Sequence, residues 1–333
     1  QNRVPFRWDA CAGLELLPVP GTVGRQFYTP DASGDGSNII TYDHNFDTGL
    51  KTTYVWVRQG WKQVQVPAID TTFCVPMAMS DSGNFVAFDN YEYPKSILRW
   101  DRSAGSVQTL DVEQGYATPL AMSGDGNCIV GWAEISDGHG DWFYRGPAKW
   151  IGSDGPFLMP TPQAGDDVYF YPNATNHDGS VTVGERWQEN VGWNGVALRW
   201  GSSGNPVELG MLPGTTRSIA YSVSGDGNVV VGDCGVAGLT TKAFVWTPQS
   251  GMRDLAEVLT EKGIDFSGWA LRTALCVSRD GTTIAGWGEH DGGIGYFVVR
   301  VGNIIRKVDT LVQFNGLRHE TDKYKPEVVE AQV

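Results

Sequence analysis

A short turn motif recurs six times along the chain and constrains its fold more than any other feature. Each copy has a small apolar lead, the sequence Ser-x-Asp-Gly or a variant of it, and then an apolar run. The copies lie at residues 33–36, 80–83, 123–126, 176–179, 224–227 and 278–281. Gly supplies the positive φ that a tight turn needs, while Ser, Asn and Asp side chains hydrogen-bond the turn backbone. Each copy therefore predicts a β-hairpin, whose two strands we denote A and B.

A second element alternates with the first: an apolar pair, a Trp, a polar turn and a short apolar strand. Its tryptophans are Trp8, Trp56, Trp100, Trp150, Trp200 and Trp246. A seventh copy, over residues 296–311, has Val298 where Trp is expected. We interpret this element as a hairpin of strands C and D. A large aromatic side chain that recurs once per repeat is expected to pack between neighbouring repeats.

Four short antiparallel strands in each repeat of about 50 residues predict an all-β fold, a β-propeller. The high content of Gly (43 of 333) and Trp (13) agrees with many tight turns and packed strands. We expect one helix, at residues 254–262, in a D-to-A connection, because strong helix formers there end at Gly263.

The number of blades follows from counting hairpins. The chain has seven C–D hairpins, beginning with one at residues 4–18, and only six A–B hairpins. Seven four-stranded blades in a single domain, 1–333, are predicted if the tail at 313–333 supplies the missing strands beside the first hairpin. The alternative is six blades with an accessory N-terminal hairpin.

Charge and motif content exclude several classes of function. Lys and Arg number 25 against 38 Asp and Glu, a net charge of -13, which argues against nucleic acid or an anionic membrane as partner. No apolar stretch is long enough for a transmembrane helix, so no membrane insertion is expected. The five Cys have no zinc-like spacing, and no nucleophile elbow, P-loop or dinucleotide fingerprint occurs.

The repeats resemble those of the HAF-repeat family of extracellular proteins. The resemblance is clearest over residues 219–300, in the runs AYSVSGDGNVVVGD and LTEKGIDFSGWALRTALCVSRDGTTIAGWGE. Residues 80–83, 176–179 and Val298 depart from the family pattern. The resemblance implies a secreted or cell-surface location and names no catalytic residues.

Six acidic residues each lie near the end of a strand B. They are Asp43, Asp89, Glu134, Glu185, Asp233 and Glu289. Five of the six lie an even number of residues from the turn glycine, so they are expected on one side of their strands. One interpretation is a set of carboxylates that holds Ca²⁺ or accepts hydrogen bonds from sugar hydroxyls. The alternative is that they cap exposed strand ends of an acidic protein.

Two histidines and two arginines in the same connections are candidate catalytic residues. His44 follows Asp43, and His290 lies between two acidic residues. A His beside a carboxylate can act as a base near neutral pH, although an ordinary solvated loop His fits equally. Arg217 and Arg272 could neutralise a substrate carboxylate.

Aromatic residues in these connections favour carbohydrate as the ligand. The candidates are Tyr42, Tyr91, Trp132, Trp187, Trp287 and Trp269. Aromatic faces stack on sugar C–H groups while nearby polar atoms bond hydroxyls. We therefore predict a secreted or cell-surface propeller that binds an extracellular glycan. Two alternatives are a polysaccharide lyase acting on a uronic-acid-containing glycan, and a structural subunit whose tail pairs with a neighbour.

Overall fold

The computed structural model describes most of the chain. The described residues are 5–9, 13–19, 25–45, 47–48, 51–58, 62–64, 74–91, 95–110, 115–136, 142–161, 168–188, 194–202, 205–236, 240–301, 311–315 and 328–329. Contacts divide the chain into two compact units, 1–159 and 160–333, and each is described by itself.

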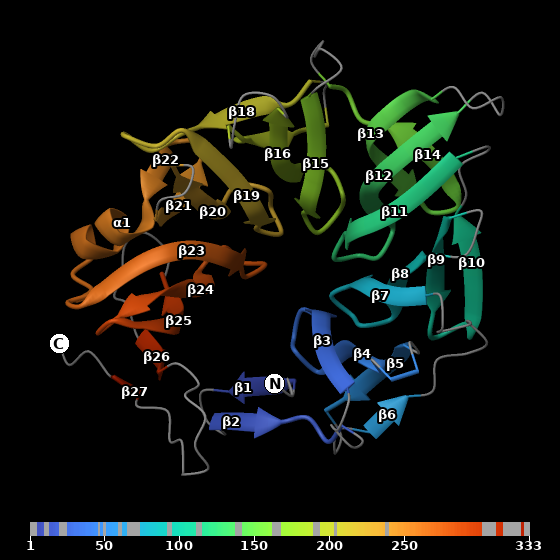
Figure 1. The fold of residues 1–333 in the computed structure, drawn as a ribbon, viewed down its shortest axis with the longest axis horizontal. Helices are drawn as coiled ribbons and strands as arrows, with labels where there is room; N and C mark the ends of the chain where they lie inside the picture. The colour runs from blue at the N-terminus through green and yellow to red at the C-terminus, as the bar shows by residue number, and fades with distance from the viewer. Residues whose placement is uncertain are drawn as a thin grey trace. The chain divides into compact units, whose positions relative to one another are not determined.

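The first unit holds three antiparallel sheets of four strands, each built from consecutive strands (Figure 1). They are β3 (Arg25–Ala32), β4 (Asn38–Asn45), β5 (Lys51–Val57) and β6 (Lys62–Val64); β7 (Cys74–Met79), β8 (Phe85–Asn90), β9 (Ser96–Asp101) and β10 (Ser106–Leu110); and β11 (Gly115–Met122), β12 (Cys128–Ser136), β13 (Trp142–Ile151) and β14 (Asp154–Leu158). A separate two-stranded sheet, β1 (Phe6–Asp9) and β2 (Gly13–Leu16), precedes them.

The second unit holds three further sheets of the same kind. They are β15 (Val168–Thr175), β16 (Thr182–Gln188), β17 (Val196–Trp200) and β18 (Val207–Gly210); β19 (Arg217–Val223), β20 (Val230–Gly235), β21 (Thr241–Thr247) and β22 (Gly251–Asp254); and β23 (Trp269–Val277), β24 (Thr283–His290), β25 (Gly293–Arg300), β26 (Leu311–Asn315) and β27 (Val328–Val329). The prediction of an all-β propeller with four-stranded antiparallel blades is therefore confirmed. We number the blades first to sixth in chain order.

Each Ser-x-Asp-Gly motif forms the turn between the first two strands of a blade, and its side chains account for the sequence. In the fifth blade the Ser224 hydroxyl donates to Asp226 and accepts from the amide of Val229 at 2.9 Å. Gly227 supplies a φ of 75°. In the fourth blade Asn176 Oδ1 replaces the hydroxyl and accepts from the Val181 amide at 2.9 Å. The variant turns therefore keep the same hydrogen bond.

The turns of neighbouring blades also bond one another. In the first unit the amide of Gly34 donates to the carbonyl of Asp81 at 2.9 Å, and the amide of Asp81 donates to Gly124 at 2.8 Å. In the second unit the amide of Gly225 donates to Arg279 at 2.8 Å. The second residue of the motif thus links consecutive blades within each unit.

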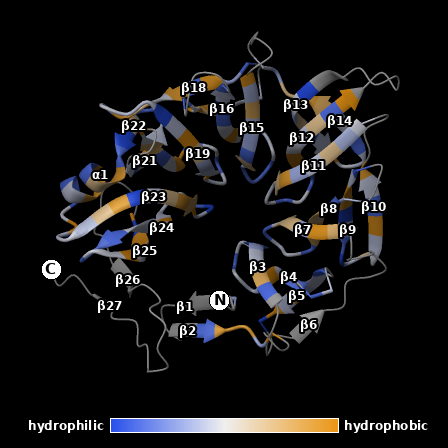
Figure 2. Cartoon of the chain, viewed as in Figure 1, coloured by the Kyte–Doolittle hydropathy of each residue, from blue (hydrophilic) through white to orange (hydrophobic). Residues whose placement is uncertain are grey.

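The repeated tryptophans pack as expected. Trp100 lies in one buried cluster with Ile40 and Val55 of the first blade, and Trp150 lies in another with Ile97 and Leu110 of the second. The prediction that each Trp packs between neighbouring blades is confirmed for these two. Figure 2 shows hydrophobic residues along the strands of both units, for example on β11 and β23.

In the last repeat, the residue equivalent to the repeated Trp is one position later than predicted from the sequence. Trp246 pairs with Val230 in the ladder of the fifth blade, and Val299 pairs with the equivalent Ile284 in the sixth. Val299, rather than Val298, therefore occupies the Trp position. Val299 is fully buried.

The prediction of seven blades is not confirmed: the described residues form six, the stated alternative. The hairpin β1–β2 forms a sheet of its own. Within the tail, β26 pairs with β25 and β27 pairs with β26. These tail strands extend the outer edge of the sixth blade rather than add inner strands beside the first hairpin. The rest of 313–333 lies outside the described residues.

The expected helix is present as α1 (Leu255–Glu261), between β22 and β23. Asp254 caps its start by accepting from the amide of Ala256 at 2.9 Å, and Gly263 follows with a φ of 77°. Leu255 and Leu259 are fully buried in a cluster that holds residues of the fifth and sixth blades. In the part of the chain that the structure describes, no helix has the length and hydrophobicity to cross a bilayer.

Candidate functional site

A pocket of about 300 Å³ lies in the second unit where strands of the fourth and fifth blades end. Its lining comprises Tyr171 on β15, Glu185 and Trp187 on β16, Gly195 before β17, and Arg217 and Ile219 on β19. Three of these, Glu185, Trp187 and Arg217, were singled out from the sequence in three separate roles. The structure brings them to one pocket.

Strand pairing explains why these side chains converge. Tyr171 lies opposite Glu185, and Tyr169 opposite Trp187, in the ladder of β15 and β16. Side chains two residues apart share one face of a strand, so Glu185 and Trp187 project to the same side. The ring of Tyr169 packs on Trp187 with centroids 5.8 Å apart, which holds the indole beside the pocket.

The Glu185 carboxyl is partly buried and is a weaker acid than usual. Burial raises the pKa of Glu185 to about 7, against the opposing effect of the Arg217 charge and with a further rise from Asp233. A Cβ atom added at Gly195 would lie 2.8 Å from Glu185 Oε2. The absence of a side chain at Gly195 therefore makes room for the carboxyl.

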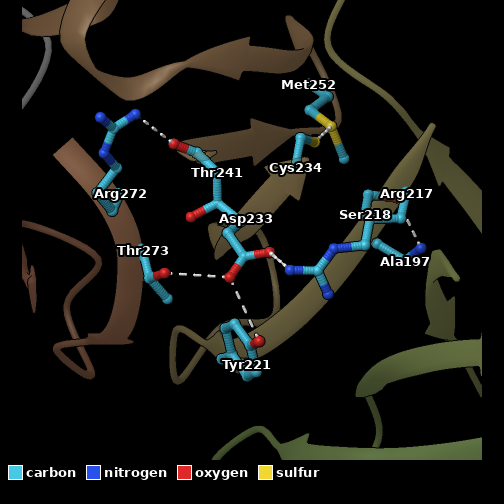
Figure 3. A network of polar contacts seen from close by, with 10 residues as sticks. All are labelled: Ala197, Arg217, Ser218, Tyr221, Asp233, Cys234, Thr241, Met252, Arg272 and Thr273. Atoms are coloured by element: carbon cyan, nitrogen blue, oxygen red, sulfur yellow. Dashed lines mark hydrogen bonds and ion pairs between the residues drawn. The ribbon is translucent and has the colours of Figure 1, made fainter. Parts of the chain in front are cut away.

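Asp233 on β20 is 3% exposed and lies beside Arg217 of the pocket lining (Figure 3). Its Oδ2 accepts from the Thr273 hydroxyl at 3.1 Å and the Tyr221 hydroxyl at 3.3 Å. The Nη2 atom of Arg217 lies 3.5 Å from Oδ1. Burial raises the pKa of Asp233, whereas Arg217, Thr273 and Tyr221 lower it. Asp233 also raises the pKa of Tyr221, after burial as the main cause.

The strand that carries Arg217 is held by its neighbour Ser218. The Ser218 hydroxyl donates to the carbonyl of Gly210 at 2.7 Å and accepts from the amide of Ala197 at 2.9 Å. The Ser218 amide donates to the carbonyl of Gly195 at 2.9 Å. Since Ser218 is fully buried, these bonds fix the start of β19 against the fourth blade.

The pocket can therefore bind a polar ligand and move a proton. Trp187 and Tyr171 offer aromatic surface, and Arg217 offers a cation that two carboxyl groups already share. A carboxyl group with a pKa near 7 exists in both protonation states at neutral pH, which suits an acid or base.

Three other predicted residues lie together in the first unit. Tyr91 is 48% exposed, and the Nζ atoms of Lys51 and Lys95 lie 4.5 and 4.8 Å from its ring centroid. Asp89 is buried, with Lys95 Nζ 3.5 Å from Oδ2. Burial raises the pKa of Asp89. Burial, together with the charge of the nearby Asp89 carboxylate, raises the pKa of Tyr91 to about 12. Tyr42 stacks on Tyr28 with centroids 4.8 Å apart.

The two candidate histidines lie in different units and at strand ends rather than in loops. His44 is on β4 and His290 is the last residue of β24. His290 Nδ1 lies 3.4 Å from Asp291, and its ring packs on Trp269 with centroids 4.9 Å apart. The structure assigns neither histidine to the pocket of the second unit.

Arg272, the second arginine predicted to neutralise a substrate carboxylate, already pairs with Glu289. Arg272 holds Glu289 through two contacts, Nε–Oε1 at 3.2 Å and Nη2–Oε2 at 2.9 Å, and its Nη1 donates to the carbonyl of Thr241. The hydrogen bonds from Arg272 lower the pKa of Glu289. This pair binds the fifth blade to the sixth through Thr241.

The remaining predicted residues have partners in their own blades. Asp43 is fully buried and accepts from the amide of Thr52 at 3.1 Å and the hydroxyl of Tyr54 at 3.2 Å. Glu134 accepts from the Trp132 indole at 3.4 Å. Trp287 is partly buried on β24.

The predicted calcium site gains no support from these positions. Among the described residues, no group of three or more His, Cys, Asp or Glu side chains is arranged to hold a metal ion. We therefore derive no chemistry through a metal.

Two residues, Gly195 in the pocket lining and Thr273 beside Asp233, were not singled out from the sequence. Gly195 and Thr273 carry no signal of their own, because their roles depend on which strands lie beside them. Tyr171 and Tyr221 lie on the A strands that precede turn motifs.

Solved structures share the fold at low sequence identity. A prolyl endopeptidase matches with a TM-score of 0.63 and 9% identity, over 95% of this chain and 47% of that chain. An oligogalacturonate lyase, solved in complex with manganese, matches with a TM-score of 0.55 and 14% identity, over 96% and 85%. TolB from Acinetobacter baumannii matches at 0.49 and 13%, over 84% and 61%.

The chain thus spans about half of the endopeptidase and 61% of TolB. No protein-family model and no curated protein sequence matches it. The likenesses to the endopeptidase and the lyase show the β-propeller fold and nothing about activity.

Proposed function

We propose that this protein is an extracellular propeller of the HAF-repeat kind that binds a glycan in the pocket of Glu185 and Arg217. The observation that carries the proposal is the convergence of Trp187, Tyr171, Arg217 and Glu185 around about 300 Å³. The secreted or cell-surface location rests on the resemblance of the repeats.

Each side chain would have a separate part in binding. The faces of Trp187 and Tyr171 would pack on sugar C–H groups. Arg217 would bond a carboxylate or hydroxyl of the ligand, since a guanidinium has five donors and the two carboxyl groups beside it do not use all of them. Glu185, with a pKa of about 7, can donate as an acid or accept as a carboxylate. A uronic-acid glycan therefore suits the pocket better than a neutral one.

A second candidate is a polysaccharide lyase, which the acidity of Glu185 specifically favours. The ionised Glu185 carboxylate would remove the proton beside a uronate carboxylate, and Arg217 would neutralise the charge that develops there. The electron pair would form a carbon–carbon double bond as the glycosidic C–O bond breaks. The leaving oxygen would take a proton from Tyr171 or solvent. The likeness to oligogalacturonate lyase supports this candidate only by analogy of fold.

A panel of soluble acidic and neutral polysaccharides tests both candidates. Each would be incubated with the protein and followed by ultraviolet absorbance of unsaturated uronate and by reducing ends, and retention would be measured on immobilised glycan. Retention of the protein without new products supports the binding protein, and unsaturated uronate supports the lyase. Reducing ends without unsaturated product would indicate a hydrolase. Neither retention nor products on any acidic glycan would refute both proposals.

A further inference from the structure

A second pocket, of about 390 Å³, lies in the first unit beside the turn of the second blade. It is lined by Asn38 on β4, the turn residues 82–84, and Trp100, Arg102 and Ser103 at the end of β9. It lies at the turn-motif ends of its strands, whereas Asp89 and Tyr91 lie at the other end of β8. It is therefore separate from the predicted ligand residues.

Arg102 is the one charged residue in this lining, and within the described residues no carboxylate forms an ion pair with it. Its Nη1 donates to Asn38 Oδ1 at 2.9 Å and to the carbonyl of Gly83, and its guanidinium lies 5.9 Å from the Trp100 ring centroid. Its Nε is buried and has no hydrogen-bond partner in the part of the chain that the structure describes. Burial lowers the pKa of Arg102. A partly buried cation with an unpartnered N–H is unfavourable and attracts an anion.

The adjacent carboxylate, Asp101, is engaged elsewhere. Its Oδ1 accepts from the amide and hydroxyl of Ser103 at 2.9 and 2.7 Å and from Asn84 Nδ2 at 3.2 Å. These bonds organise the turn after β9 and leave Arg102 without an ion pair to Asp101.

A second donor in the lining also lacks an acceptor. Trp100 is 3% exposed, and its indole Nε1 is buried without a hydrogen-bond partner. The equivalent indole of Trp56 donates to the Thr41 hydroxyl at 2.9 Å, and that of Trp200 donates to the carbonyl of Pro160 at 2.8 Å. The Trp position can thus satisfy its indole, although in the described part of the chain the buried Nε1 of Trp150 has no partner either, so Trp100 shares this state with the third blade.

The fold does not require an arginine at this place. Arg102 lies two residues after the repeated Trp. The first blade also has an arginine here, Arg58, whereas the third, fourth and fifth blades have Gly152, Ser202 and Pro248. These blades form the same sheets without a cation. Arg102 therefore calls for an explanation other than blade geometry.

We propose that this pocket binds a ligand through an oxyanion group, a carboxylate or sulfate, paired with Arg102. The Ser82 hydroxyl lines the same space and can donate to such a group. The volume lies in the range of small-molecule sites and exceeds what a lone inorganic ion needs. The ligand is thus an acidic sugar or an anion of similar size. In a chain of net charge -13, local complementarity rather than overall charge would attract it.

Titration of the full chain with sodium sulfate and with sodium galacturonate tests the proposal, with sodium chloride at equal ionic strength as reference. We expect saturable one-site binding of galacturonate, followed by calorimetry and by the NMR signal of the Trp100 indole N–H. Arg102→Gln should weaken binding at least about tenfold, the loss typical of a charge-assisted contact. Arg253→Gln, which removes an exposed arginine paired with Glu261 in the second unit, is the matched control.

A second variant keeps the test valid if Arg102→Gln fails to fold. Ser103→Glu adds a carboxylate to the lining and retains Arg102, so it should abolish anion binding and raise the melting temperature. Unchanged affinity in both variants, or no saturable signal from either anion, would overturn the proposal. Sulfate binding without galacturonate binding would contradict the sugar-sized ligand. Because the pocket of Glu185 is in the other unit, Trp187→Ala should leave this binding intact.

Discussion

Arg217 on β19 places its Nη2 atom 3.5 Å from Oδ1 of Asp233, which lies on the adjacent strand β20 and is 3% exposed. Burial raises the pKa of Glu185 on the fourth blade, and the same positive charge partly opposes that rise. One guanidinium therefore serves a buried structural carboxyl and a carboxyl that faces a pocket. This arrangement links the stability of the second unit to the chemistry of the site.

Removal of the Arg217 charge should lower the free energy of unfolding. Arg217→Met leaves Asp233 buried without its cation, and we expect a loss of about 3 kcal/mol in the free energy of unfolding at neutral pH. The loss should shrink at acidic pH, where Asp233 is protonated. Urea unfolding measures both values. Arg186→Gln, which breaks an exposed pair with Glu208, should cost less than about 1 kcal/mol. Equal losses in the two variants would contradict the assignment.

Glu185 should make the fold less stable as pH rises. Its pKa is about 7 in the folded state, above the usual 4.5, so the folded state holds the proton more tightly than the unfolded chain. The stability that the protonated form supplies is complete below about pH 4.5 and is lost as pH rises to about 7. Glu185→Gln should flatten the profile of unfolding free energy across this window by about 3 kcal/mol. A profile unchanged by the substitution would show that Glu185 titrates normally, and Glu208→Gln is the exposed control.

Gly195 should act as a positioning residue for Glu185. Its Cβ in Gly195→Ala would lie 2.8 Å from Glu185 Oε2, so the carboxyl must shift. We expect weaker glycan binding and a changed Glu185 pKa, measured by NMR of the carboxyl carbon, with little loss of stability. Gly201→Ala is the matched control, because its Cβ would meet only an Arg199 atom at 3.7 Å. Identical glycan affinity and pKa in the two variants would contradict this role.

The turn glycines should differ in tolerance according to what lies beside them. Gly227 and Gly251 have similar φ values, 75° and 65°, and so carry similar strain of about 1–2 kcal/mol on substitution by Ala. An added Cβ at Gly227 would also lie 2.7 Å from Val181 Cγ2 on the fourth blade, whereas Gly251 has open space. Thermal and urea unfolding should rank Gly227→Ala as the more damaging by at least about 1 kcal/mol. The reverse order would contradict the close approach of turn and neighbouring blade.

The blade could be predicted from the sequence because its signals are local. Ser224, Asp226 and Gly227 act within one turn, so their spacing is sufficient to place strands A and B. The helix at 255–261 likewise follows from its own formers and caps. The register of the last repeat could not be settled in this way, since without an indole Val298 and Val299 are alike until β24 and β25 are paired.

The site could be predicted only as a list of candidates. Even spacing from the turn glycine places Asp89, Glu185 and Asp233 on equivalent strand positions, yet Asp89 and Asp233 are buried and Glu185 faces a pocket. The difference depends on neighbours from other strands, such as Gly195 beside Glu185 and Thr273 beside Asp233. Such neighbours are distant in sequence, and no motif in one strand encodes them.

The central claim, that a glycan binds beside Glu185 and Arg217, is tested most directly by calorimetric titration of the full chain with an oligogalacturonide. The account predicts saturable binding that weakens at least about tenfold in Trp187→Ala, with the fold intact by circular dichroism. Trp132→Ala, which removes an aromatic residue from the equivalent strand of the third blade, should retain the affinity of the original protein. Loss in Trp132→Ala with full affinity in Trp187→Ala, or no binding by the original protein, would contradict it.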